Sequence, residues 1–150
     1  MNNEILNTGF AVHVNEDSSY KTEFFNAPLD SLFRSAREIL SCEYVSVVFP
    51  NTLPAGYCLL VDDDASALGR KVSAIGTFLF GHYLEDIPLC GPFLIVKYFE
   101  NENRQKVFSF LSEREANEVT DCLEKQVVPR IKKALEAMIR KKKKEKFTVI

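Results

Sequence analysis

"FLIVKYFENENRQKVFSFLSERE", residues 93 to 115, decides the fold of this chain. The run from Phe93 to Phe99 is mostly apolar, β-branched or aromatic, which is typical of a strand. Val107 to Phe110 forms a second such run beyond the polar turn 101–104, so the two are expected to pair as a hairpin. Ser112-Glu113-Arg114-Glu115 matches a capping box, in which a serine hydroxyl and a glutamate carboxylate satisfy free N–H groups at a helix start. The stretch therefore predicts a hairpin followed at once by a helix.

On the N-terminal side, the alternation over 10–14 predicts a short strand, and a turn at 15–19 leads to a second extended piece at 20–25. The period then changes to that of a helix, with Asn26 or Asp30 as its cap and Pro28 in its first turn. The apolar residues at helical spacing are Leu29, Leu32, Phe33, Ala36 and Leu40. We expect this helix to pack on a sheet.

The middle of the chain contains a second pair of apolar runs, at 44–49 and 57–61, which predicts another hairpin. Residues 65–92 have no clean period and are punctuated by glycines, so we expect an irregular excursion across one face of the sheet. After the capping box, the helix is expected to reach about Val127, where Pro129 imposes a kink or a new first turn. A second helical stretch then leads into the lysines.

These segments together predict an α+β fold with a mixed or antiparallel sheet of about five strands, one early packed helix and C-terminal helices. The 150 residues suit one ordinary domain, and the composition, 46% hydrophobic and 27% charged, is that of a globular protein. We assign residues 1–128 to a single domain and residues 129–150 to a C-terminal helix with a basic tail.

Charge is distributed unevenly along the chain. Residues 130–146 hold nine Lys and Arg against two Glu, a local charge of +7, whereas the remainder carries −9. The basic cluster comprises Arg140, Lys141, Lys142, Lys143 and Lys144, and we expect it to form a frayed, solvated tail. Such a tail can complement the acidic body, contact nucleic-acid phosphates without reading bases, or bind an acidic patch on a partner protein.

No apolar run approaches the roughly 20 residues that span a bilayer, and the start Met1 to Glu4 lacks the basic residues of a signal peptide. We therefore expect a cytoplasmic protein without membrane contact. Cys42, Cys58, Cys90 and Cys122 are scattered singly, with only His13 and His82 to complete a metal set. We expect structural thiols and no metal or cofactor; a catalytic cysteine beside a histidine is the alternative.

Three groups are candidates for chemistry. Asp62-Asp63-Asp64 can hold a divalent cation or act in acid–base catalysis, although consecutive residues in an extended chain point in different directions, which favours a solvated loop exit. His82 stands near Glu85 and Asp86 and can shuttle protons. Arg70 and Lys71 follow the acidic turn and can contact a nucleotide phosphate. Because no catalytic motif is visible, we do not expect an enzyme, and a small hydrolase using the aspartates is the weakest hypothesis.

Four pieces of the chain, at Leu32 to Val48, 59–63, 89–96 and 111–115, match the pattern of a known family. On these pieces the middle of the chain, about residues 8–123, resembles a domain-of-unknown-function family of small proteins from phages, plasmids and conjugative elements, although Ser41-Cys42 replaces the glycine pair of the family pattern. The function of this family is unknown, so the resemblance does not imply an activity. The resemblance implies a mobile genetic element, where small single-domain proteins often blunt host defence by binding.

The leading hypothesis is therefore a non-catalytic accessory protein of a mobile element, an inhibitor of a host defence system that binds a host protein or a signalling nucleotide. In that case Arg70, Lys71 and His82 are the candidate ligand-binding residues. The alternative is a nucleic-acid-binding accessory factor that uses the basic cluster from Arg140 to Lys144.

Overall fold

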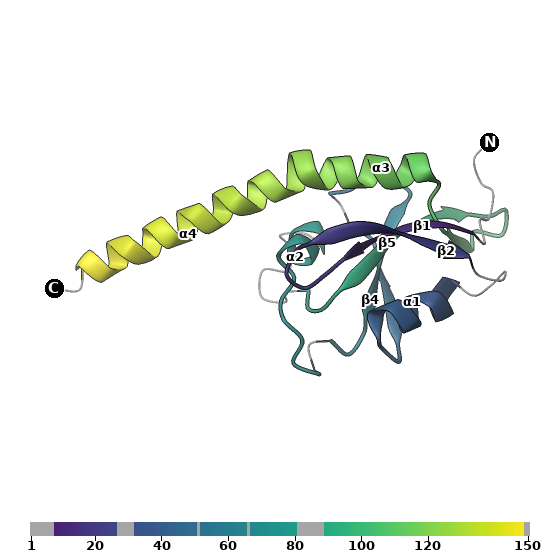
Figure 1. The fold of residues 1–150 in the computed structure, drawn as a ribbon, viewed down its shortest axis with the longest axis horizontal. Helices are drawn as coiled ribbons and strands as arrows, with labels where there is room; N and C mark the ends of the chain where they lie inside the picture. The colour runs from purple at the N-terminus through teal and green to yellow at the C-terminus, as the bar shows by residue number, and fades with distance from the viewer. Residues whose placement is uncertain (1–7, 27–31, 51, 66, 81–88, 149–150) are drawn as a thin grey trace.

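The chain forms one antiparallel sheet with helices on both faces (Figure 1), which confirms the predicted α+β class. The computed structural model describes residues 8–26, 32–50, 52–65, 67–80 and 89–148, and it describes only the backbone of Leu135, Met138 and residues 141–148. The strands are β1 (Thr8–Val14), β2 (Tyr20–Asn26), β3 (Val45–Val48), β4 (Tyr57–Asp62), β5 (Phe93–Glu100) and β6 (Lys106–Ser109). The helices are α1 (Leu32–Leu40), α2 (Ala74–Phe80), α3 (Glu113–Cys122), the π-helical turn η2 (Leu123–Val127) and α4 (Val128–Thr148).

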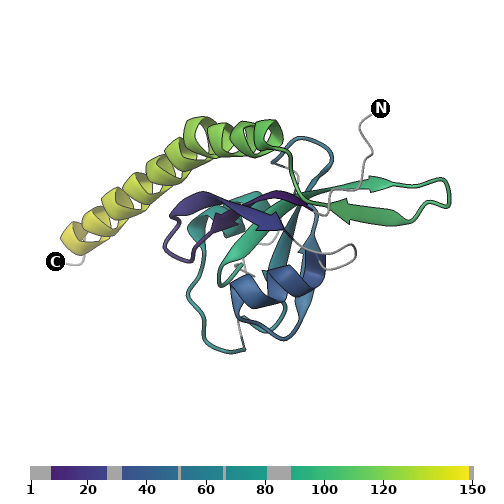
Figure 2. The ribbon, with the colours of Figure 1, turned by 45° about the vertical axis from the view of Figure 1, so that its right-hand side comes forward.

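The described strands make a six-stranded sheet in the order β2-β1-β5-β4-β3, with β6 paired to β5. Every pairing is antiparallel, so the mixed alternative is wrong, and the sheet has one strand more than the five expected. The end of β5 and β6 form a hairpin that projects from the body (Figure 2). Both predicted hairpins are confirmed, and the structure shows in addition that the first two strands pair with each other.

Two apolar cores lie on opposite faces of the sheet. One face packs against α2, α3 and η2, and the other against α1. The central strands supply side chains to both cores: Leu59 and Ile95 point to the first, and Leu60 and Leu94 to the second. This explains why 57–61 and 93–96 are continuous apolar runs, since a strand covered on both faces has no solvent side to alternate with.

Helix α1 begins at Leu32 and buries Ala36 and Leu40 against the sheet, as the helical spacing predicted. Its predicted cap, at Asn26 or Asp30 with Pro28, falls largely on residues 27–31, which lie outside the described residues, while Asn26 is the last residue of β2. A basic residue, Arg37, lies in the last turn of the helix, where it complements the helix dipole.

The prediction of an irregular excursion over 65–92 was wrong for part of this segment, because residues 74–80 form α2. The Ser73 hydroxyl accepts a hydrogen bond from the Gly76 N–H (3.0 Å), an arrangement typical of a helix N-cap. Gly76 lies within the helix because a Cβ there would come 2.5 Å from a Leu89 methyl group and 3.0 Å from the Phe93 ring. Close packing thus requires a glycine at this position, and the glycine interrupts the apolar helical spacing that would otherwise have predicted α2 from the sequence.

The capping box is confirmed: the Ser112 hydroxyl accepts from the Glu115 N–H, and the Glu115 carboxylate accepts from the Ser112 N–H. The helix from this cap passes through η2, where the Val128 N–H bonds to the Leu123 carbonyl five residues earlier. Pro129 follows immediately. Proline has no N–H for the ordinary i−4 bond and its ring crowds that carbonyl, so a wider turn before it accommodates the ring without ending the helix.

Helix α4 continues through the lysines to Thr148 and leads away from the sheet (Figures 1 and 2). The expectation of a frayed tail beyond Ile139 was therefore wrong. Lysine is a good helix former, and positive charge near a helix C-terminus is stabilised by the helix dipole. Residue pattern alone had suggested fraying because the apolar positions end at Ile139.

Candidate functional site

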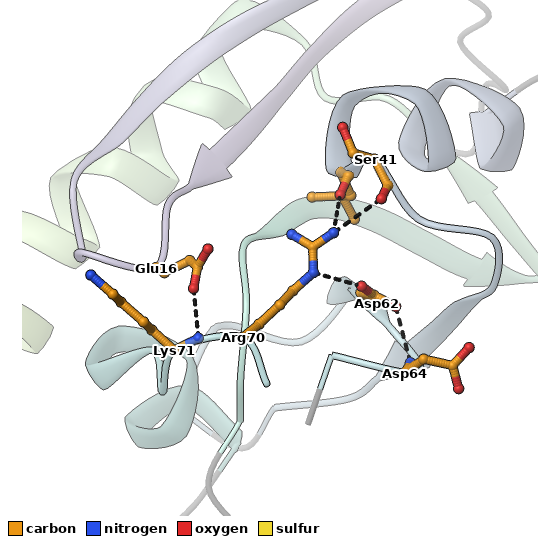
Figure 3. A network of polar contacts seen from close by, with 7 residues as sticks. Glu16, Ser41, Asp62, Asp64, Arg70 and Lys71 are labelled. Atoms are coloured by element: carbon orange, nitrogen blue, oxygen red, sulfur yellow. Dashed lines mark hydrogen bonds and ion pairs between the residues drawn. The ribbon is translucent and has the colours of Figure 1, made fainter. Parts of the chain in front are cut away.

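Arg70 lies between the C-terminal end of α1 and the end of β4 (Figure 3). Its Nε lies 3.0 Å from Oδ2 of Asp62, whose side chain is 1% exposed. A terminal guanidinium nitrogen donates to the main-chain oxygens of Leu40 (3.4 Å) and Ser41 (3.0 Å). Arg70 therefore neutralises a buried carboxylate and satisfies carbonyl groups that the last turn of α1 leaves free.

Lys71 is held through its backbone rather than its side chain. Its N–H donates to Oε2 of Glu16 (2.7 Å), and its carbonyl accepts from the Gly91 N–H (2.8 Å). The Lys71 side chain is exposed and points away from Arg70 (Figure 3). The two predicted ligand cations are neighbours in sequence, but their side chains do not converge on one surface. Contact of either residue with a ligand stays a prediction.

The acidic run at the end of β4 diverges. Asp62 points into the ion pair with Arg70, and its Oδ1 accepts from the Asp64 N–H (3.0 Å). Asp63 accepts a short hydrogen bond from the Ser46 hydroxyl, and the Asp64 carboxylate points away from Arg70 (Figure 3). Within the described ranges, no group of three or more His, Cys, Asp or Glu side chains is placed to hold a metal ion. The three aspartates therefore lie where β4 ends and the following loop begins, and of these only Asp62 is buried.

Of the two histidines, the structure describes only His13. His82, together with Glu85 and Asp86, lies outside the described residues. His13 is buried in β1, with its Nδ1 3.7 Å from Oε1 of Glu23, and neither ring nitrogen has a hydrogen-bond partner among the described residues. The same Glu23 oxygen lies 2.9 Å from Nζ of Lys21. His13 is therefore packed beside an ion pair at the sheet edge.

The cysteines for which a thiol pKa shift is resolved are poor nucleophiles. Burial raises the pKa of the Cys58 thiol to about 12. The pKa values of Cys42 and Cys122 are also raised, in both cases chiefly by burial and further by a neighbouring aspartate, Asp62 and Asp121 respectively. Since the thiolate is the reactive form, these three cysteines suit the predicted structural role.

A group that the sequence reasoning missed lies between β4, β5 and the start of α3. Nζ of Lys97 lies 2.9 Å from Oε1 of Glu115, next to a small cavity of about 170 Å³ lined partly by Tyr57. Burial raises the pKa of Tyr57 to about 12, and the negative charges of Glu115 and Glu118 add to the effect. The tyrosine is thus neutral at physiological pH, and the ion pair ties β5 to α3. Lys97, a charged residue within the apolar run 93–99, is the feature of the sequence that could have indicated this group.

The basic cluster lies on the part of α4 that leads away from the sheet. Ile131 still packs against the first core, but Ile139, two turns further on, is 55% exposed, and Arg140 is exposed. Lys141, Lys142, Lys143 and Lys144 continue the same helix. The backbone of α4 thus carries the basic cluster on a regular helix that leads away from the sheet.

Comparison with known proteins gave no match: no family model, no curated protein and no solved structure is similar to the chain at a significant level. The resemblance to the domain-of-unknown-function family stays a prediction. In the described part of the chain, no helix is long and apolar enough to cross a membrane.

Proposed function

We propose that the protein is a non-catalytic nucleic-acid-binding factor in which α4 contacts the phosphate backbone. The observation that carries this proposal is the continuous helix from Val128 to Thr148, which takes the basic cluster away from the sheet. Consecutive helix positions point in different directions, so the basic residues surround the axis of α4, and those three or four positions apart share one side. The residues on one side can contact phosphates without the ordering cost of a disordered tail.

The charge of the segment supports this choice. Residues 130–146 carry a local charge of +7, and the rest of the chain carries −9. The acidic body repels a polyanion, so contact with nucleic acid is restricted to α4. Because α4 leads away from the body rather than folding onto it, internal charge complementation is less well supported than a separate anionic partner.

The folded body offers less support for a nucleotide site. Arg70 is engaged by Asp62 and by two carbonyl groups, and the side chain of Lys71 points elsewhere. The leading hypothesis from the sequence, an inhibitor of a host defence system encoded by a mobile element, places the contact on this body. It stays a prediction, and it becomes the preferred hypothesis if the nucleic-acid test fails.

The test is a salt series of binding to mixed-sequence duplex DNA. The variant replaces Lys141, Lys142 and Lys143 by glutamine, which keeps helix propensity and removes three charges. A matched control replaces Lys71, Arg104 and Lys106, all exposed on the body, in the same way. We expect the wild-type affinity to fall steeply with salt, and the α4 variant to lose roughly 0.9 of the slope per phosphate contact removed.

The control should keep both affinity and salt slope. Absence of DNA binding by the wild-type protein, or equal losses in the α4 variant and the body control, would contradict the proposal. In either case α4 is not the specific contact for DNA phosphates, and a protein or small-ligand partner of the body becomes the better hypothesis.

A further inference from the structure

Strand β2 is the last strand on one side of the described sheet. It pairs with β1 on one side, and no described strand pairs with it on the other. Phe24 is 62% exposed, and Lys21 and Thr22 are also exposed. A groove of about 360 Å³ lies between the end of β2 and α1, so the described chain leaves this end of the edge uncovered.

The hydrogen bonds of β1 show which backbone groups of β2 face outward. Phe10 exchanges both of its main-chain hydrogen bonds with Leu111, on the side of β1 away from β2. Phe24, opposite Phe10, therefore cannot bond to it and turns its own N–H and carbonyl to the open side. By alternation, Tyr20 and Thr22 also present their backbone groups outward. An edge with these groups unpaired is a template for another strand.

We propose that β2 pairs antiparallel with β2 of a second copy of this chain, about a two-fold axis at Thr22. In this register Thr22 meets Thr22 of the second copy, and the outward backbone groups of Tyr20 and Phe24 pair across the axis. The exposed Phe24 ring then lies beside the Tyr20 ring of the second copy, on the face that carries α3. Aromatic pairs directly opposite each other are among the stabilising cross-strand contacts.

Charge complementarity selects this register and this partner. With the axis at Thr22, Lys21 of each copy lies directly opposite Glu23 of the other, on the face that carries α1. Moving the axis to Glu23 would place the two Glu23 carboxylates opposite each other, which is repulsive. Moving it to Phe24 would leave Lys21 and Glu23 without an opposite charge in the second copy, and only the contact between them within each chain would remain. One strand thus carries a self-complementary pattern, as an interface between identical copies requires.

The test is the mass of the full chain in solution, without nucleic acid, measured by sedimentation equilibrium over a concentration series. We expect a species of twice 17.1 kDa at high concentration. Lys21→Glu or Glu23→Lys alone places like charges opposite each other and should weaken the dimer roughly tenfold or more. The double variant K21E/E23K exchanges the two charges, restores opposite pairs and should recover the dimer.

A thermal melt of each variant establishes that it is folded, and Phe24→Ala provides a charge-neutral change at the same edge that should also weaken the dimer. A monomer mass up to about 1 mM overturns the proposal. So does a dimer that survives either single charge reversal, or one that the double exchange fails to restore, since a different surface would then join the copies. The outcome is independent of DNA binding by α4.

Discussion

Arg70 illustrates how one side chain connects elements that are distant in sequence. It lies 29 residues after Ser41, yet the two are joined by a hydrogen bond from the guanidinium to the carbonyl, and its Nε pairs with Asp62. Removing the guanidinium would leave a buried carboxylate without a counter-charge and free the carbonyl groups of Leu40 and Ser41. The sequence does not show these contacts, because they depend on the packing of α1 against β4, and Arg70 was therefore predicted to bind a ligand.

We predict that Arg70→Ala lowers the free energy of unfolding by about 3 kcal/mol, the usual cost of leaving a buried charge unpaired. Lys71→Ala is the matched control, since the exposed side chain can be removed while the backbone hydrogen bond to Glu16 remains. It should change stability by less than about 0.5 kcal/mol. Urea denaturation of the three proteins measures both effects. Equal free energies of unfolding for the two variants would show that the Arg70 guanidinium does not stabilise the buried Asp62 carboxylate.

At the scale of elements, Glu115 combines two tasks at the start of α3. Burial by itself would raise the pKa of its carboxyl, but hydrogen bonds from the Ser112 N–H and the Lys97 ammonium outweigh it and hold the pKa below the usual 4.5. A carboxyl whose pKa is lower in the folded protein contributes stability that is present above its unfolded pKa and is lost as the pH falls through the folded value.

Glu115→Gln should therefore be less stable than the wild type at about pH 7, and the difference should shrink at a pH below the lowered pKa of the folded carboxyl, where the wild-type side chain is protonated. Glutamine still accepts the capping hydrogen bond, so the comparison reports mainly the charge. Urea unfolding at the two pH values provides the measurement, with Glu113→Gln, exposed in the same turn, as the control. A difference that is equal at both pH values would mean that the charge of Glu115 does not stabilise the fold.

The sequence predicted the elements whose signal is local. The capping box marked α3, and the continuous apolar runs marked β4 and β5. It missed α2, because Gly76 is required by the close approach of Leu89 and Phe93, contacts that a sequence does not display. It recognised that Pro129 disturbs the helix but could not distinguish a kink from a new turn, since the π-helical solution depends on the packing of Leu123 and Val127 on the sheet.

At the scale of the whole molecule, the charge asymmetry was readable from the sequence, whereas its placement was not. A basic segment of that composition is compatible with a tail folded on the acidic body or with a projecting helix. The candidate ligand residues show the same limit: sequence proximity grouped Arg70 with Lys71, but the side chains diverge. Whether the basic residues on α4 and the outer edge of β2 are exposed to a partner depends on how all the elements are arranged in space.

Because the sheet and its two cores are complete before the lysines begin, truncation after Ile139 should leave the folded body intact. The removed residues are beyond the described contacts of α4 with the core, of which Ile131 is the last. Exposed charges contribute little to stability, so we expect a change below about 0.5 kcal/mol in the free energy of unfolding and a thermal midpoint close to that of the full chain. Truncation after Val127 removes Ile131 as well and should destabilise the protein by about 1 kcal/mol or more. Urea and thermal denaturation of the three chains measure these values; a large loss on the first truncation would show that the distal half of α4 packs on the body.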